Sequence, residues 1–275
     1  MELNVDGRRV YAATGGRPFD AARPAVLLVH GAGMDHTVWQ LPARWLAWHG
    51  HSVLALDLPG HGRSEGPVPG SVPELAQWLG RVMDAAGVER ATVVGHSMGG
   101  AVALEAAAAL PERIARIALL GTAAAIPVNA ALLEAAREAP ERAYQMMTAW
   151  AHGAAAKMGG HPVPGLWMTG GSLALLARNA PGVLHADLAA CAAWTSGPEA
   201  AGQVRCPALV ILAANDIMTP PRNGAELARL IAGARTVTLP DCGHMLLAEQ
   251  PDATLDALIG FLAEGVSPLA TKVVH

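Results

Sequence analysis

The stretch GHSMGG at residues 95–100 carries the strongest chemical signal in the sequence. It has the form G-x-S-x-G, follows the apolar run 91–94 and precedes the alanine-rich helical pattern 101–110. A sharp turn from strand to helix holds such a serine in a strained backbone conformation, with its hydroxyl clear of the sheet and near the positive end of the helix. The glycines of the motif leave room for neighbouring backbone. Ser97 is therefore the predicted nucleophile.

A serine hydroxyl needs a general base, and the base needs a carboxylate that orients it. Two downstream segments supply these groups. Asp216 lies just past the carboxyl end of the apolar run 208–212, at the edge of an open α/β sheet where functional groups gather. His244 follows the run 236–239 and precedes a helical pattern. Ser97, Asp216 and His244 are therefore candidates for a nucleophile, an orienting acid and a base.

The elements that must position these residues alternate along the chain. Short continuous apolar runs predict strands buried on both faces. They occupy residues 25–29, 52–56, 91–94, 114–120, 208–212 and 236–239, after a hairpin pattern at residues 3–13. Helical patterns lie between them, at about residues 41–48, 72–86, 101–110, 222–231 and 253–262. This alternation predicts an α/β fold, a mostly parallel twisted sheet of about eight strands with helices on both faces.

One interval interrupts the alternation. Residues 122–204 contain helical patterns and Gly/Pro breaks but no clear buried strand. The interval is too apolar for a solvated linker, because it holds Met146, Met147, Trp150, Met158, Trp167, Met168 and Trp194. We therefore expect an insertion that lies above the sheet.

Five segments together resemble the α/β-hydrolase superfamily over essentially the whole chain. They are HGAG at 30–33 with Trp39, DLPGHGRS at 57–64, the GHSMGG motif, Asn215-Asp216 and Gly243-His244. The resemblance implies that Ser97, Asp216 and His244 form a catalytic triad, in the chain order that this superfamily uses. It also implies a core domain of residues 1–121 and 205–275 and a helical cap of residues 122–204.

The same resemblance, together with the mechanism, predicts an oxyanion hole. One donor is the backbone N–H of Met98, the residue after the nucleophile, and the second is that of Ala32, with Gly33 as the alternative. For contacts with substrate we expect Gly33 and His96 near the nucleophile and Met147 and Trp150 in the cap. The cap methionines and tryptophans either line an apolar acyl pocket or only pack the cap onto the sheet.

Several other residues have side chains suited to metal binding, catalysis or substrate binding, but their context does not favour these roles. Five histidines occupy separate loops without zinc-site spacing, so no metal and no cofactor is expected; they are His30, His36, His49, His51 and His61. Asp57 follows a buried strand, and we expect it to shape its loop rather than serve as the triad acid. A substrate carboxylate would call for Lys157 or Arg178, which the sequence does not place. Cys191 and Cys242 are interpreted as small buried apolar residues.

Composition excludes several classes of protein. With 275 residues, 52% hydrophobic and 15% charged, the chain is not mainly disordered. A net charge of −4 without a basic block argues against nucleic acid as a partner. Glycine and proline interrupt the uncharged stretches, so no membrane span is expected, and the N-terminus lacks the features of a signal peptide. Three cysteines without C-x-x-C spacing fit a reducing compartment, so we expect a soluble, cytoplasmic protein with a small-molecule substrate.

The sequence therefore predicts a serine hydrolase that cleaves a small apolar carboxylic ester through an acyl-enzyme. The same triad also serves lactone opening, C–C bond hydrolysis, peptide cleavage, perhydrolysis and acyl transfer, and the fold does not choose among them. A small-molecule receptor that keeps the triad with little turnover is a further alternative. Whether the apolar cap covers the site or joins a homodimer stays open.

Overall fold

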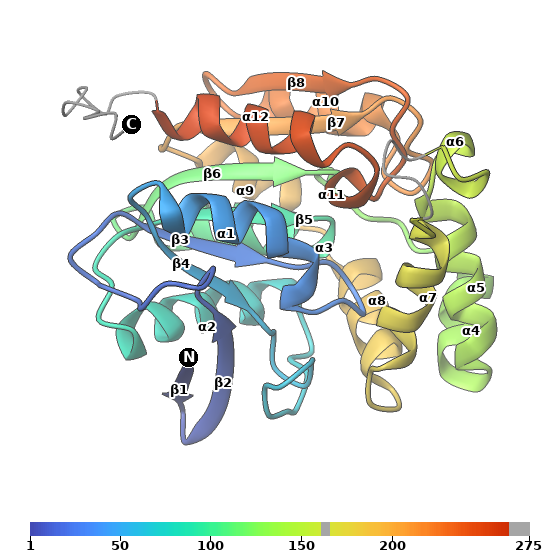
Figure 1. Ribbon diagram of the computed structural model, residues 1–275, viewed down its shortest axis with the longest axis horizontal. Coiled ribbons are helices and arrows are strands. Elements are labelled where there is room, and N and C mark those ends of the chain that lie inside the picture. Colours follow the sequence, from blue (N-terminus) through green and yellow to red (C-terminus); the bar gives the residue numbers. More distant parts are fainter. Residues whose placement is uncertain (161–165, 264–275) are drawn as a thin grey trace.

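A computed structural model describes residues 1–160 and 166–263. In it, eight strands form one sheet in the order β1-β2-β4-β3-β5-β6-β7-β8 (Figure 1). The strands are β1 (Glu2–Val5), β2 (Arg8–Ala13), β3 (Ala25–Val29), β4 (Ser52–Leu56), β5 (Ala91–His96), β6 (Ile114–Leu120), β7 (Ala208–Ala213) and β8 (Arg235–Leu239). The hairpin β1-β2 is antiparallel and joins β4 antiparallel, while every pair from β4 to β8 is parallel. The mostly parallel, eight-stranded α/β sheet predicted from the sequence is confirmed.

Helices cover both faces of the sheet because alternate strand residues point in opposite directions. In β3, Val26 and Leu28 pack toward the face covered by α1 (Gln40–Trp48) and α12 (Pro251–Ala263). Leu27 and Val29 pack toward the opposite face. That face carries α2 (Val72–Ala85), α3 (Met98–Ala109) and α10 (Pro221–Leu230). The central strands are buried on both sides, which explains their unbroken apolar runs.

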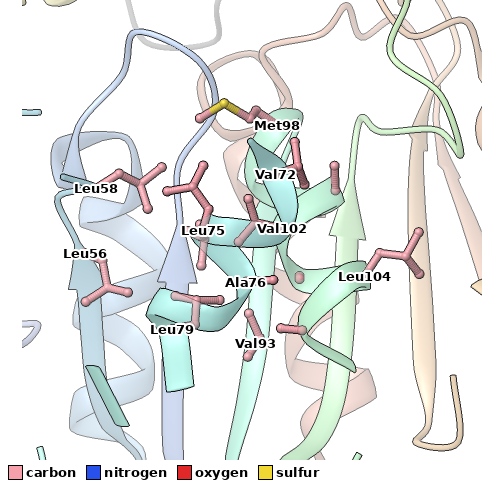
Figure 2. Packing of buried hydrophobic residues seen from close by; sticks show 14 of the residues in the cluster. Leu56, Leu58, Val72, Leu75, Ala76, Leu79, Val93, Met98, Val102 and Leu104 are labelled. Atoms are coloured by element: carbon pink, nitrogen blue, oxygen red, sulfur yellow. The ribbon is translucent and has the colours of Figure 1, made fainter. Parts of the chain in front are cut away.

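Helix α2 shows how the sequence pattern produces this packing. Ser71 caps its N-terminus by accepting a hydrogen bond from the backbone N–H of Glu74. Its predicted apolar face is buried against α3 and the sheet (Figure 2), and it consists of Leu75, Leu79, Val82 and Met83. The alanine-rich α3 has little side-chain bulk, so it fits between α2 and the strands and carries Ser97 at its start.

In α1 the apolar spacing does not coincide with the buried face. Leu41 and Trp48 are 56% and 53% exposed, whereas the side chains that face the sheet include Ala43 and Leu46. Trp48 lies beneath the guanidinium of Arg17, 4.8 Å from the ring centroid. Cation–π contact therefore accounts for an aromatic residue that the helical spacing alone would place in the core.

All the regular elements in the described chain between β6 and β7 are helices. They are α4 (Ala130–Glu138), α5 (Pro140–Ala151), α6 (Ala154–Lys157), α7 (Met168–Ala177), α8 (Val183–Ala193) and α9 (Gly197–Gln203). Helices α4 to α8 gather at the carboxyl end of the parallel strands (Figure 1). Helix α9 instead packs against α3 and α10 of the sheet domain. We propose that the cap consists of α4 to α8, and that α9 belongs with the core domain.

Two short elements complete the surroundings of the site. They are the 3₁₀ helix η1 (His36–Trp39) after β3 and α11 (Leu246–Glu249) after β8. In residues 1–160 and 166–263, every helix falls short of the length and apolarity that crossing a membrane requires.

Candidate active site

Ser97 occupies the turn between β5 and α3 in a strained backbone conformation. Its φ is 55° and its ψ is −119°, which non-glycine residues rarely adopt. The turn is tight because glycine lies on either side of the serine. A Cβ at Gly95 would lie 2.0 Å from the carbonyl oxygen of Gly99, and a Cβ at Gly99 would lie 2.2 Å from that of Val29. The G-x-S-x-G spacing is therefore a steric requirement of this turn.

Asp216 and His244 form a buried pair at the ends of neighbouring strands. Asp216 follows β7 and His244 follows β8, and the two strands are parallel partners. The Nδ1 atom of His244 lies 2.7 Å from Oδ2 of Asp216, and the exposed fractions of the two side chains are 2% and 1%. With Nδ1–H donated to the carboxylate, Nε2 of the imidazole carries the lone pair of a general base.

The carboxylate of Asp216 is held in its charged form. Burial works against ionisation, but the nearby charge of His244 and hydrogen bonds from His244 and Thr219 lower the pKa of Asp216 below its usual value. Oδ1 also accepts hydrogen bonds from the backbone N–H groups of Met218 and Thr219, at 2.8 and 2.9 Å. Four donors thus fix the orientation of this carboxylate.

Thr219 is a site residue that the sequence did not reveal. Its Oγ1 lies 2.8 Å from Oδ2 of Asp216, 2.8 Å from the carbonyl oxygen of Gly121 and 3.3 Å from Nδ1 of His244. Thr219 and Ser97 line the same cavity. The threonine therefore connects the His244–Asp216 pair with the cavity in front of Ser97. Its position three residues after Asp216, in an Asx-type turn, is the only signal that could have suggested it.

His96 supports the loop that carries His244. Its Nε2–H donates to the carbonyl oxygen of His244 at 2.8 Å, and its side chain is fully buried. Burial, together with the nearby charge of His244, lowers the pKa of His96 to about 3, so the ring is neutral at physiological pH. It does not line the cavity at Ser97. His96 thus contacts the backbone of His244, the candidate base, in place of the contact with substrate that the sequence predicted.

Glu249, in α11, also holds the His244 loop and was missed by sequence reasoning. Its buried carboxylate accepts hydrogen bonds from the backbone N–H groups of Gly153, Gly243 and Met245, at 2.9, 3.1 and 3.2 Å. Gly153 belongs to the cap, whereas Gly243 and Met245 flank His244. One carboxylate therefore fastens the cap to the loop of the base. Nothing in its local sequence distinguishes Glu249 from a solvent-exposed helical glutamate.

Two unpaired backbone donors lie beside Ser97. Among the hydrogen bonds of the described residues, none uses the N–H of Ala32 or of Met98. Ala32 lines the cavity with Ser97, and Met98 begins α3, where helical N–H groups have no partner within the helix. By contrast, the N–H of Gly33 donates to Oδ2 of Asp187 at 2.8 Å. The geometry favours Ala32 over Gly33 as the second oxyanion donor.

A cavity of about 290 Å³ opens in front of Ser97, between the sheet and the cap. Of the residues that the sequence offered for substrate contact, Met147 and Trp150 line it, and Gly33 does not. Apolar side chains dominate the wall, and none of the described lining residues is charged; they include Met34, Ile126, Leu132, Leu188, Cys191, Ile217 and Met218. Such a wall favours a neutral apolar group next to the nucleophile.

The cap is attached to the sheet domain through buried polar contacts. Asp187 of α8 accepts hydrogen bonds from the backbone of Gly33 and from Nε2 of His61, the latter at 2.8 Å. Burial lowers the pKa of His61, but the charge and hydrogen bond of Asp187, together with the carbonyl of Pro59 and the charge of Asp57, raise it above its ordinary value. The side-chain amide of Asn179 donates to the carbonyl of Gly33. Gly33 and His61 thus fasten the cap rather than contact substrate.

The remaining polar candidates have protein partners. In the described part of the chain, Asp35, His36 and Asp57 form the one group with metal-ligand spacing. Asp57 accepts hydrogen bonds from the backbone and Nδ1 of His36 and from the backbone of Arg63, which is the loop-shaping role predicted for it. Asp35 accepts from the guanidinium of Arg178 at 2.6 Å. The three side chains therefore stabilise loops.

Cys191 contributes to the apolar wall of the cavity, whereas Cys242 and Lys157 do not line it. Cys191 and Cys242 are buried, as expected, and burial raises the pKa of both thiols. All three cysteines are free. Lys157 lies in α6 and does not line the cavity.

Comparison with known proteins gives consistent matches. Residues 26–257 match a family model described as "Alpha/beta hydrolase family". A pimeloyl-[acyl-carrier protein] methyl ester esterase from Aromatoleum aromaticum is 30% identical over 84% of this chain and 94% of that protein. The dihydrolipoyllysine-residue acetyltransferase component of an acetoin cleaving system from Cupriavidus necator is 43% identical, but over 42% of this chain and only 30% of that protein. The crystal structure of the enol-lactonase from Burkholderia xenovorans LB400 superimposes with a TM-score of 0.85 and 29% identity, over 96% of this chain and 100% of that one.

Proposed function

Because the chain belongs to the alpha/beta hydrolase family, we propose that it is a serine hydrolase that cleaves neutral, apolar carboxylic esters through an acyl-enzyme. The supporting observation is a strained serine at a cavity with an uncharged apolar wall, together with a buried His–Asp pair that Thr219 joins to that cavity. Each part alone occurs in other contexts. Together they match the requirements of acyl transfer from a substrate without charge near its carbonyl.

In the proposed reaction, Nε2 of His244 takes the proton of Ser97 as Oγ attacks the ester carbonyl carbon. The N–H groups of Ala32 and Met98 bind the oxyanion, and Asp216 stabilises the imidazolium. Collapse of the tetrahedral intermediate breaks the bond to the alcohol, which leaves with the proton from His244. Water then attacks the acyl-enzyme with the same base, and the carboxylic acid is released.

Each of the two oxyanion donors would stabilise the transition state by about 3 kcal/mol, which corresponds to roughly a hundredfold in rate. This effect depends on donors whose positions are fixed before the reaction. Helix α3 fixes the N–H of Met98, and the contacts of Asp187 and Asn179 with Gly33 fix the loop of Ala32. The cap therefore contributes to the proposed chemistry by stabilising the oxyanion loop.

Lactones are cyclic esters and would follow the same steps, with the alcohol remaining attached to the acyl group. The similarity to an enol-lactonase over the whole of that chain favours them as a second substrate class. The two classes differ only in the shape that the cavity must accept.

Hydrolysis of p-nitrophenyl esters from acetyl to dodecanoyl, with Ser97→Ala in parallel, tests the proposal. We expect turnover by the wild type and a loss of at least a thousandfold in the variant, at an unchanged melting temperature. Covalent labelling by a fluorophosphonate, read as added mass on intact protein, should occur in the wild type alone. Ester hydrolysis that survives Ser97→Ala would contradict the assignment of the nucleophile. Tight ligand binding without turnover or labelling would instead identify a receptor.

A further inference from the structure

Three cavities lie in a row where the cap meets the sheet domain. The catalytic cavity, about 290 Å³, shares Met34 and Met147 with a central cavity of about 20 Å³. The central cavity in turn shares Ser172, Leu175 and Met245 with a surface groove of about 840 Å³. Neighbouring cavities thus adjoin each other at side chains that line both of them.

Methionines make up most of these shared side chains. Met34, Met147 and Met245 are 6%, 5% and 5% exposed, and Met34 and Met245 pack together with Ala151 in a small apolar cluster. Methionine is unbranched and changes rotamer at low cost, so it adapts to ligands of different shape. The central cavity already has room for about one water-sized group. Small side-chain movements would therefore join the catalytic cavity to the groove.

The groove carries apolar surface that no described element covers. It lies between α7, α11 and η1, which gather at the cap end of the sheet (Figure 1). Leu41, Leu166 and Trp167 line it with exposed fractions of 56%, 47% and 71%. Contiguous exposed apolar surface of this kind marks a binding surface. Because the groove adjoins the catalytic cavity through the central one, we expect it to bind part of the substrate that reacts at Ser97.

We propose that the enzyme accepts esters of long, unbranched, neutral acyl chains, whose distal carbons pass between Met34 and Met147 into the groove beside Trp167. This inference rests on the proposed function, because it starts from an acyl group bound at Ser97. The catalytic cavity has a volume of only about 290 Å³, so an acyl chain that outgrows it must continue beyond it. The central cavity and the groove provide the continuation, and a twelve-carbon acyl chain is the probe for it.

Ala151→Leu fills the central cavity from a position that lines neither of the other two. The side chain of Ala151 lines only the central cavity. Ala135 of α4 is the matched control, since both alanines are 6% exposed and Ala135 lines none of the three cavities. We expect Ala151→Leu to keep kcat/KM for p-nitrophenyl butyrate within about twofold and to lower that for the dodecanoate at least tenfold. Ala135→Leu should leave the ratio of the two values unchanged.

An unchanged dodecanoate-to-butyrate ratio in Ala151→Leu would overturn the inference, while hydrolysis of the butyrate would leave the proposed function intact. Failure of the wild type to hydrolyse any ester longer than hexanoate would overturn it in the same way.

A binding measurement decides the inference without turnover. Methyl 12-bromododecanoate is titrated into the Ser97→Ala protein, and the bromine quenches the fluorescence of any tryptophan that it contacts. We expect saturable quenching that largely disappears when Trp167→Phe or Ala151→Leu is added. Quenching that persists in both double variants, or no quenching at all, would overturn the inference. Groove-dependent quenching in a protein that hydrolyses no ester would support the groove assignment and refute the proposed function.

Discussion

The buried, neutral state of His96 makes the stability of this protein depend on pH in a way that one substitution can isolate. The pKa of His96 is lowered from 6.5 to about 3 in the folded protein. Above about pH 7 the ring is neutral in both the folded and unfolded states, so its contribution to stability is fully present. As the pH falls below 6.5, the unfolded chain takes up a proton that the folded chain excludes, and stability is lost.

The size of this effect follows from the two pKa values. At pH 5.0, binding of the proton lowers the free energy of the unfolded state by about 2 kcal/mol, while the folded state gains almost nothing. His96→Gln retains an N–H donor for the carbonyl of His244 but does not titrate. The variant should therefore lose about 2 kcal/mol less than the wild type between pH 7.5 and pH 5.0.

Urea denaturation at the two pH values measures this difference. With a slope of about 3 kcal/mol per M, the wild-type midpoint should fall by about 0.7 M more than that of His96→Gln. All other titrating groups are common to both proteins and cancel in the comparison. The same substitution at the exposed His49 controls for the change of side chain. Equal losses of unfolding free energy in wild type and His96→Gln would refute the reasoning.

Three further substitutions test the polar contacts of the site. Asp216→Asn should lower kcat about 10⁴-fold in the p-nitrophenyl ester assay, because the amide no longer stabilises the tautomer of His244 that acts as a base. A decrease of less than tenfold would argue against Asp216 as the triad acid. Glu249→Gln leaves one of three backbone donors without an acceptor at a cost of about 2 kcal/mol, so calorimetry should show a melting temperature lower by roughly 4–8 °C. Asp187→Asn removes the carboxylate that raises the pKa of His61. That contact stabilises most below pH 6.5 and is lost as the pH rises through the raised pKa, so the variant's loss in melting temperature should be larger at pH 6 than at pH 9.

The sheet and the Ser97 turn were predictable because each depends on local sequence. Strands β3, β4 and β6 coincide with the predicted apolar runs, and β5 extends the run at 91–94 by two residues, to His96. A doubly buried strand needs apolar residues at every position, so its sequence reports its burial directly. Gly95 and Gly99 mark the turn just as clearly, since a Cβ at either would lie within 2.2 Å of a backbone oxygen.

The contacts that join distant segments were not predictable. Glu249 binds backbone N–H groups, which every residue other than proline possesses, so no partner side chain marks it in the sequence. Asp187 binds the backbone of Gly33 and the side chain of His61, and both partners lie more than 100 residues away in the sequence. Of the seven methionines and tryptophans named for the cap, only Met147 and Trp150 line the catalytic cavity. Met158 is 83% exposed, and Trp194 instead donates to the carboxylate of Glu105. Helical periodicity predicts which face of a helix is apolar. Which of two neighbouring apolar side chains on that face lines the cavity depends on how the helices pack together.

The polar contacts that attach the cap to the sheet domain limit how easily the cap can be exchanged for that of a related protein. Asp187 and Asn179 hold the loop of Gly33, and Glu249 joins Gly153 of the cap to the loop of His244. A cap grafted from another protein would arrive without the partners that these loops use, so it would alter the catalytic machinery as well as the shape of the cavity. New substrate ranges should therefore arise more readily through substitutions in the cavity wall than through replacement of the cap as a module.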